Sequence, residues 1–185
     1  MQINTIKILS ISGSLRPNSS NHSILQFIAA NAPVGVEFTI HDGIDLLPHF
    51  NPALDTEDAP EQVARLRTAI GEANGVIICT PEYAFGVPGS LKNAFDWTVS
   101  SGSFNTKPAA IITASSSGEK AHAALLNIFT ALGAKVNKDA TLLVSYMRTK
   151  VNAEGTVTDE ATRNALTNAL EALLTEIRDS NIDVS

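Results

Sequence analysis

The sequence predicts an α/β fold, in which a doubly wound, five-stranded parallel sheet carries helices on both faces. Short apolar runs typical of strands alternate along the chain with stretches whose apolar residues recur at helical spacing. Strands separated by helices form right-handed βαβ units, and such units build parallel sheets. The third predicted strand, Gly75–Cys79, is apolar throughout, as expected for a strand that is covered on both faces.

In the first half of the chain, turn-forming residues separate the predicted elements. Pro33 and Gly35 end the first helix, and Pro60 begins the second helix at its first turn, where proline's missing N–H is harmless. The segment His41–Thr56 is rich in Asp, Pro and Asn, and we expect it to be irregular. The elements in order are a strand over Thr5–Ile11, a helix over Ser20–Ala32, a short strand over Val36–Ile40, a helix carrying Val63, Leu66 and Ile70, and the strand Gly75–Cys79.

The second half continues the same alternation. Gly133 closes the fourth helix, and Asp159 and Glu160 open the last one, because acidic residues favour a helix start. The elements in order are a helix from Pro88 through Trp97, a strand over Ala109–Thr113, a helix over Gly118–Leu132, a strand with its core at Thr141–Val144, and a helix that runs to about Arg178.

A flavodoxin-like sheet with the strand order 2-1-3-4-5 accommodates these elements. Such sheets bind their ligands at the switch point, beside the carboxyl ends of strands 1 and 3. The two loops richest in candidate binding residues follow Ser12 and Cys79, at the ends of these two strands. We therefore expect the two loops to form one site.

Composition restricts the class of protein. The 185 residues suit a single domain, 1–185, and the net charge of −6 argues against non-specific nucleic-acid binding. One cysteine excludes an internal disulfide and fits a reducing compartment, so we expect a cytoplasmic protein. No signal peptide or membrane-spanning run is visible, and the four histidines lack metal-site spacing, so neither a membrane partner nor a metal is expected.

The loop after the first strand, Gly13–Asn21, is typical of a phosphate site. Ser14, Arg16, Ser19 and Asn21 supply donors beside a helix start, where the helix dipole favours an anion. The G-x-G-x-x-G of dinucleotide sites and the G-x-x-x-x-G-K-[ST] of nucleotide triphosphatases are both absent, which favours a mononucleotide. The alternative interpretation is that Ser19 or Ser20 only caps the helix and that Arg16 is a surface residue.

Two motifs resemble those of the NADPH-dependent FMN reductase family, which includes quinone, chromate and azo-dye reductases. They are Gly-Ser-Leu-Arg-x-x-Ser-x-Asn at Gly13–Asn21 and Pro-Glu-Tyr-x-x-x-x-Pro-Gly-x-Leu-Lys-Asn-Ala-x-Asp-Trp at Pro81–Trp97. A weaker similarity covers Asp42–Pro52. The pair of motifs at this separation is highly specific, and the match spans most of the chain.

The resemblance implies bound FMN, with NADPH or NADH as the electron donor and a small-molecule acceptor. It implies binding and not acid–base roles, so no catalytic side chain is expected. The phosphate would meet Ser14, Arg16, Ser19, Ser20 and Asn21; the ring would meet Pro81, Glu82, Tyr83, Ala84 and Phe85; and its pyrimidine side would meet Ser115, Ser116, Ser117 and Gly118. Backbone N–H groups near Ser117 and Gly118 would stabilise negative charge on the ring.

The chain departs from the family pattern at two places. Ala84 stands where the family usually has Asn, so one contact near the flavin is missing. The loop after the fourth strand is short and lacks the usual Arg, which Lys120 replaces imperfectly because lysine has no planar fork of donors. This second departure leaves the choice between NADPH and NADH open.

Several alternatives stay open at this point. The chain could be a flavodoxin-type electron carrier that is not an enzyme, or a binding module that has lost its flavin. Glu82 could pair with a cation across a subunit boundary, and Tyr83 could be a core or interface aromatic.

Family relatives are dimers or tetramers, so we expect a homodimer or homotetramer with the helix after Pro88 in the interface. In that helix, we expect Lys92, Asn93 and Asp96 to serve the internal structure or the contact between subunits. We expect Trp97 to pack in the core and Cys79 to be an inert buried thiol.

Overall fold

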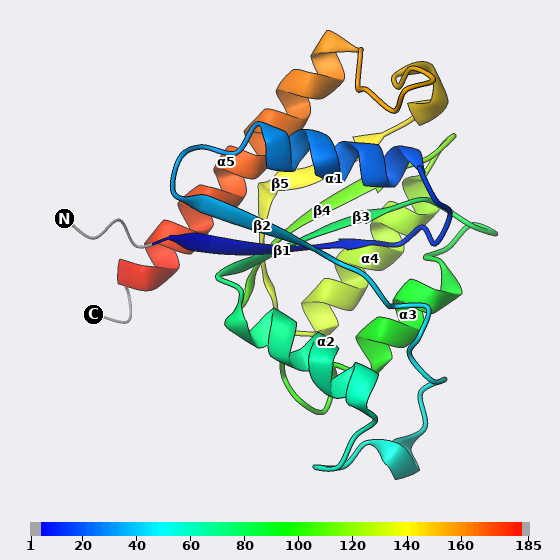
Figure 1. Ribbon diagram of the computed structural model, residues 1–185, viewed down its shortest axis with the longest axis vertical. Coiled ribbons are helices and arrows are strands. Elements are labelled where there is room, and N and C mark those ends of the chain that lie inside the picture. The colour runs from blue at the N-terminus through cyan, green and yellow to red at the C-terminus, as the bar shows by residue number, and fades with distance from the viewer. Residues whose placement is uncertain (1–4, 183–185) are drawn as a thin grey trace.

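The computed structural model describes residues 5–182 and contains a five-stranded parallel sheet in the order β2-β1-β3-β4-β5 (Figure 1). The predicted fold class and strand order are confirmed. The strands are β1 (Ile6–Ser12), β2 (Val36–His41), β3 (Gly75–Thr80), β4 (Pro108–Ala114) and β5 (Lys135–Val144). Because β1 pairs directly with β3, the two loops singled out in the sequence begin side by side.

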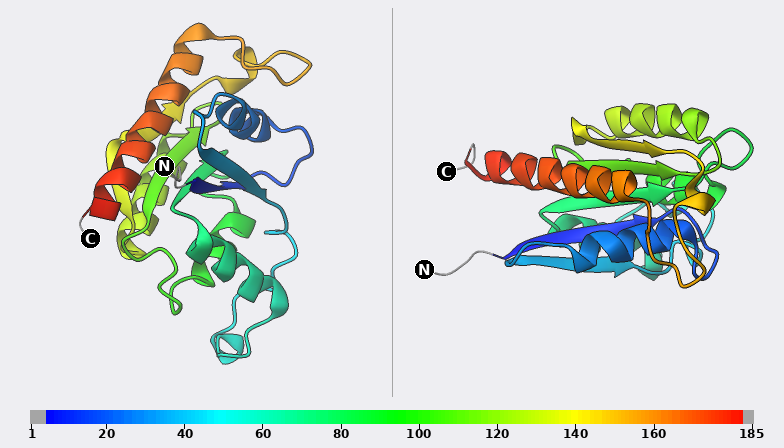
Figure 2. Two further views of the ribbon diagram at one scale, coloured as in Figure 1. Left: turned by 60° about the vertical axis from the view of Figure 1, so that its left-hand side comes forward. Right: turned by 90° about the horizontal axis from the view of Figure 1, so that it is seen from above.

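Helices cover both faces of the sheet. One face carries α1 and α5, and the other carries α2, α3 and α4 (Figures 1 and 2). The helices are α1 (Ser20–Ala30), α2 (Glu61–Glu72), α3 (Gly89–Asp96), α4 (Glu119–Ala131) and α5 (Glu160–Ile182), with short 3-10 helices η1 (Pro52–Leu54) and η2 (Met147–Thr149). Within residues 5–182, no helix is both long and apolar enough to cross a membrane.

Alternate side chains of each central strand pack into two separate cores. Ile8 of β1 and Ile77 of β3 face α1 and α5, whereas Leu9 and Val76 face the other three helices. Every residue of β3 and β4 is buried, which confirms the double coverage expected for the third strand.

The boundaries of some elements differ from prediction for local reasons. β5 begins at Lys135, six residues before its expected core, because its polar first half still pairs with β4 across a register shift between Ala109 and Ile111. α1 ends at Ala30 because the Asn31 side-chain amide donates a hydrogen bond to the carbonyl oxygen of Phe27. α5 continues to Ile182, four residues beyond its expected end, and the other ends move by one or two residues, as for Pro60, which precedes α2 instead of lying in its first turn.

The segment between β2 and α2 is irregular, as predicted, but α3 holds it tightly. The Asn93 side chain accepts a hydrogen bond from Phe50 N–H at 2.8 Å and donates one to the carbonyl oxygen of Pro48 at 3.0 Å. The Trp97 indole N–H donates to the same Pro48 oxygen, and its ring packs edge-on against Phe50. Asn93 therefore serves internal structure, and the predicted packing role of Trp97 is confirmed.

A partly buried ion pair secures the same segment from α2. The Arg67 guanidinium donates a hydrogen bond to Asp55 at 2.6 Å and another to the carbonyl oxygen of Trp97. The hydrogen bond from Arg67 to Asp55, with one from Ser100, holds the pKa of Asp55 below its usual value. The segment with the weak sequence similarity, Asp42–Pro52, is thus held by the α3 motif. We call the contacts of Asn93 and Trp97 with Pro48 and Phe50 the clamp.

Candidate functional site

A cleft lies at the carboxyl ends of the strands, between the start of α1 and the loops after β3, β4 and β5. Figure 1 shows these segments at one edge of the sheet. We call it the central cleft. It is lined by Ser14, Arg16, Ser19, Ser20, Asn21, Pro81, Glu82, Tyr83, Ala114, Ser115, Ser116, Met147 and Arg148. Loops more than 60 residues apart in the sequence thus meet where the strand order predicted a ligand.

The start of α1 supplies unpaired donors to this cleft. The Ser19 side chain caps the helix by accepting a hydrogen bond from His22 N–H, so part of the capping alternative is correct. Its own hydroxyl hydrogen stays available, and the backbone N–H groups of Ser20 and Asn21 donate to no atom of residues 5–182. Capping and anion binding are therefore compatible at this position.

Gly13 serves packing at this loop. A Cβ added there would lie 2.3 Å from the Thr80 hydroxyl oxygen and 2.9 Å from Leu91, so only glycine fits against the end of β3. This close approach is to the protein itself and sets the path of the chain into the Ser14–Ser20 turn.

The side chain of Asn21 is engaged inside the protein. It is buried; its amide donates to the carbonyl oxygen of Ala114 and its oxygen accepts from the Cys79 thiol at 3.3 Å. Asn21 thereby ties α1 to the ends of β3 and β4. Cys79 is fully buried, and burial raises the pKa of its thiol, as expected for an inert group.

Arg16 is exposed, and its guanidinium forms no ion pair with any carboxylate of residues 5–182. Together with the hydroxyls of Ser14, Ser19 and Ser20 and the helix N–H groups, it makes a donor set in which no carboxylate of residues 5–182 pairs with the guanidinium. Such a set suits a terminal phosphate, which brings several acceptor oxygens and about two negative charges.

The loop after β3 forms a tight hairpin whose tip points outward. Tyr83 and Gly86 exchange both backbone hydrogen bonds around Ala84 and Phe85, which both have positive φ. Two-residue turns of this kind favour Asn and Gly, because those residues adopt positive φ at little cost. The Asn usual in the family at position 84 therefore also has a backbone reason, beyond a contact with the flavin.

Four predicted residues lie outside the lining of the central cleft. Ala84 and Phe85 form the exposed hairpin tip, and the Phe85 side chain is 79% exposed. Ser117 and Gly118 lie at the start of α4, beyond the part of their loop that reaches the cleft.

Glu82 caps α4 from the neighbouring loop. Its carboxylate accepts hydrogen bonds from the backbone N–H groups of Lys120 and Ala121 and from the Ser117 hydroxyl. These donors hold the pKa of Glu82 below its usual value, the Ala121 N–H contributing most. Within residues 5–182 the partners of Glu82 are helix N–H groups and a hydroxyl, and the alternative that it pairs with a cation across a subunit boundary stays open. Glu82 thus uses the N–H groups of Lys120 and Ala121, while the expected stabilisation of the flavin by N–H groups near Ser117 and Gly118 stays a prediction.

The loop after β5 forms a wall that sequence reasoning missed. Backbone N–H groups of Tyr146 and Met147 donate to the carbonyl oxygens of Ser116 and Ser115, which joins this loop to the one after β4. The join brings Met147 and Arg148 into the central cleft. In a parallel sheet all carboxyl ends lie at one edge. The position of Arg148 shortly after the fifth strand could therefore have indicated that it lies near the site.

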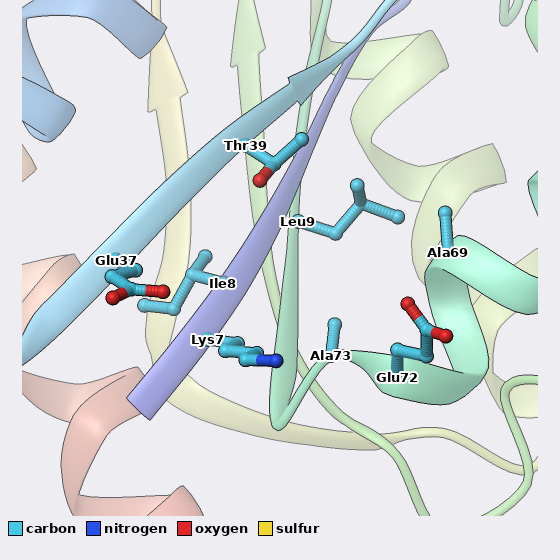
Figure 3. Close-up of a pocket in the computed structure, with 8 residues that line it drawn as sticks. All are labelled: Lys7, Ile8, Leu9, Glu37, Thr39, Ala69, Glu72 and Ala73. Atoms are coloured by element: carbon cyan, nitrogen blue, oxygen red, sulfur yellow. The ribbon is translucent and has the colours of Figure 1, made fainter. Parts of the chain in front are cut away.

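Another groove lies away from this edge, between the first halves of β1 and β2 and the end of α2 (Figure 3). Its charged side chains are Lys7, Glu37 and Glu72, and Figure 3 shows them on β1, on β2 and at the end of α2, respectively. It shares no residue with the predicted site and lies away from the strand ends where α/β sheets bind ligands. The central cleft is therefore the candidate site.

Comparison with known proteins identifies the same family that the two sequence motifs resemble. The sequence pattern of the NADPH-dependent FMN reductase family matches residues 6–149. An NAD(P)H-dependent FMN reductase of Pseudomonas aeruginosa is 32% identical over 178 residues, covering 94% of this chain and 96% of the relative. A quinone reductase of Escherichia coli is 31% identical over 174 residues, covering 90% and 93%. The flavoenzyme FerB of Paracoccus denitrificans, an NAD(P)H:(acceptor) oxidoreductase, superposes with a TM-score of 0.83 at 32% identity, covering 95% and 98%.

Proposed function

The chain belongs to the NADPH-dependent FMN reductase family, and we propose that its central cleft holds the FMN on which this activity depends. The protein is an oxidoreductase that uses FMN and NAD(P)H to reduce quinones, flavins or similar acceptors. Bound FMN supplies hydride acceptance from a nicotinamide and two-electron delivery to an acceptor. The relatives are named as reductases, which favours an enzyme over the carrier alternative.

The observation that carries the proposal is the unpaired donor set at the start of α1. Arg16, three serine hydroxyls and two helix N–H groups converge there with no carboxylate pairing Arg16 within residues 5–182. We assign the phosphate of FMN to this set. The side chain of Asn21 acts indirectly, because its hydrogen bonds to β3 and β4 hold the helix start in place.

The ring of FMN then lies toward Pro81, Tyr83, Ser115 and Ser116, which complete the cleft. Glu82 N–H donates to the Ser115 hydroxyl, so the two loops keep a fixed separation. The backbone N–H of Ser116 donates to no atom of residues 5–182 and lies in the lining of the cleft. In the loop after β4, this N–H is the donor that is available to the pyrimidine side of the ring. The sequence alone led us to expect N–H groups near Ser117 and Gly118 to serve this purpose.

The proposal also covers the oligomeric state of the protein and its location in the cell. We propose a homodimer or homotetramer, supported by the exposed apolar side chains of Tyr83 and Phe85 at the rim of the cleft. Sedimentation of the flavin-loaded protein as a monomer would contradict this. We also propose a cytoplasmic location, which the single buried, free cysteine supports. Cell fractionation tests it.

The experiment that tests the function uses the purified protein loaded with FMN. We expect a flavin absorbance spectrum that persists through gel filtration, and oxidation of NADPH or NADH that depends on an added naphthoquinone. A protein that retains FMN yet oxidises neither nicotinamide with any of a panel of quinones and flavins would be a carrier. A protein that does not bind FMN at all would be a binding module.

A further inference from the structure

A second cleft adjoins the central one. We call it the α1 cleft, because it lies between α1 and the loop that joins β5 to α5. Figure 1 shows where these two segments lie. Its lining is polar and consists of Arg16, Asn18, Ser20, Ser23, Gln26, Arg148, Val151, Asn152, Ala153, Glu154 and Gly155. Arg16, Ser20 and Arg148 line both clefts, so a ligand can pass from one into the other.

Two arginine side chains, Arg16 and Arg148, lie where the two clefts join. Neither Arg16 nor Arg148 forms an ion pair with a carboxylate within residues 5–182, whereas Arg67 is fully engaged with Asp55. The FMN phosphate accounts for Arg16, which belongs to the loop leading into α1. Arg148 comes from the opposite wall, and Glu154 is the one carboxylate among the lining residues. The junction therefore holds a second guanidinium, from a different loop than the one assigned to the FMN phosphate.

The wall that carries Arg148 is well formed. Val151 and Val157 pair across a turn that the Asn152 side chain closes by accepting from Thr156 N–H at 2.7 Å. At its tip, Gly155 has positive φ, and a Cβ added there would lie 3.1 Å from the Ser23 hydroxyl oxygen. The turn thus fits closely against α1, and the α1 cleft is bounded on two sides by fixed backbone.

We propose that the α1 cleft binds the adenosine half of NADPH and that Arg148 recognises the 2′-phosphate. This inference rests on the proposed function, since it names the donor that uses the same flavin. A planar guanidinium suits a phosphate bidentately, and NADH lacks that group. Gln26 and Asn152 supply amide donors and acceptors for the ribose and the base. Arg148 would thereby distinguish NADPH from NADH, a choice that the short loop after β4, with Lys120 in place of the usual Arg, leaves open.

The test measures binding without turnover. FMN-loaded protein is titrated calorimetrically with adenosine 2′,5′-bisphosphate and, separately, with 5′-AMP, which lacks the 2′-phosphate. We expect the bisphosphate to bind about tenfold tighter or more, as a charge-assisted contact provides. In Arg148→Gln this ratio should fall to near one. Lys138→Gln removes one positive charge from an exposed site on β5 and should keep the ratio.

Steady-state kinetics provide a second readout. The ratio of kcat/KM for NADPH to that for NADH should fall about tenfold or more in Arg148→Gln and stay constant in Lys138→Gln. An unchanged ratio in Arg148→Gln overturns the inference, as does loss of FMN retention with that ratio preserved, which would assign Arg148 to the flavin phosphate. If the wild-type protein oxidises neither nicotinamide, the proposed function fails, and the calorimetric comparison still decides whether this cleft reads a 2′-phosphate.

Discussion

Glu82 accepts a hydrogen bond from the backbone N–H of Ala121 at 2.9 Å, so the loop after β3 caps the helix that follows β4. An acceptor at a helix start is usually supplied by the residue just before the helix, but Gly118 at that position has no side chain to offer. The long-range cap couples two loops of the central cleft. Its carboxylate also places a fixed negative charge beside the site.

Replacing Glu82 by Gln should weaken this cap in a pH-dependent way. Because the folded-state pKa of Glu82 lies below its usual value of 4.5, the charged cap stabilises the protein above about pH 4.5. That stabilisation is lost as the pH falls through the folded-state pKa. At pH 7 we expect Glu82→Gln to lower the free energy of unfolding by about 1 kcal/mol.

Thermal unfolding from pH 7 to pH 3 measures this effect. The difference between Glu82→Gln and the wild type should shrink as the pH falls below about 4.5, the usual pKa of glutamate. Glu57→Gln, at an exposed glutamate with no ion pair within residues 5–182, should show almost no difference at any pH. A constant gap for Glu82→Gln down to pH 3 would mean that its charge does not cap α4.

Asn93→Ala should release the segment between β2 and α2. The substitution leaves Phe50 N–H and one hydrogen-bonding position of the Pro48 oxygen unsatisfied, so we expect a loss of about 2 kcal/mol in the free energy of unfolding. Urea denaturation measures this loss. Lys92→Ala, one residue earlier, breaks only an exposed pair with Asp96 and should cost less than about 0.5 kcal/mol. Equal losses for the two variants would refute the clamp.

Ala84→Asn should stabilise the protein, which is unusual for a substitution at the edge of a binding site. Ala84 has φ of +49°, a conformation that Asn adopts more readily than Ala. We expect a gain of about 0.5 kcal/mol in the free energy of unfolding. Ala123→Asn on the exposed side of α4 should instead lose about 0.7 kcal/mol, because Asn is a poorer helix former. If both substitutions lowered the free energy of unfolding by a similar amount, the positive φ assigned to residue 84 in the turn between Tyr83 and Gly86 would be contradicted.

Arg16→Ala should weaken FMN binding. One charge-assisted hydrogen bond contributes about 1.5–3 kcal/mol, so the dissociation constant should rise about tenfold or more. Fluorescence titration of the flavin-free protein with FMN measures it. Arg65→Ala, on the exposed side of α2, should bind like the wild type. If the affinity for FMN is the same in Arg16→Ala, Arg16 is a surface residue, as the alternative interpretation held.

The fold was predictable because its signals are local. The apolar run at Gly75–Cys79 and the helical spacing around it depend on neighbours in the sequence, and the strand order follows from how such units wind. The first half of β5 was missed because its residues are polar, and a partner strand rather than burial holds them in the sheet.

The site was predictable in outline and not in its contacts. The motif residues Ser14, Arg16 and Tyr83 line the central cleft as expected. The roles of Glu82 and Asn21 depend on groups that lie 39 and 93 residues away, and no local pattern reveals such hydrogen bonds. Arg148 was missed for the same reason, since hydrogen bonds between its loop and the loop after β4 bring it to the cleft.

The most direct test of the account is a crystal structure of the protein with bound FMN. We predict that the phosphate contacts Arg16, the Ser14 and Ser19 hydroxyls and the first backbone N–H groups of α1, and that the ring lies along Pro81–Tyr83. FMN bound elsewhere, for example in the groove between β1, β2 and α2, would contradict it, as would a central cleft filled by a ligand without a phosphate.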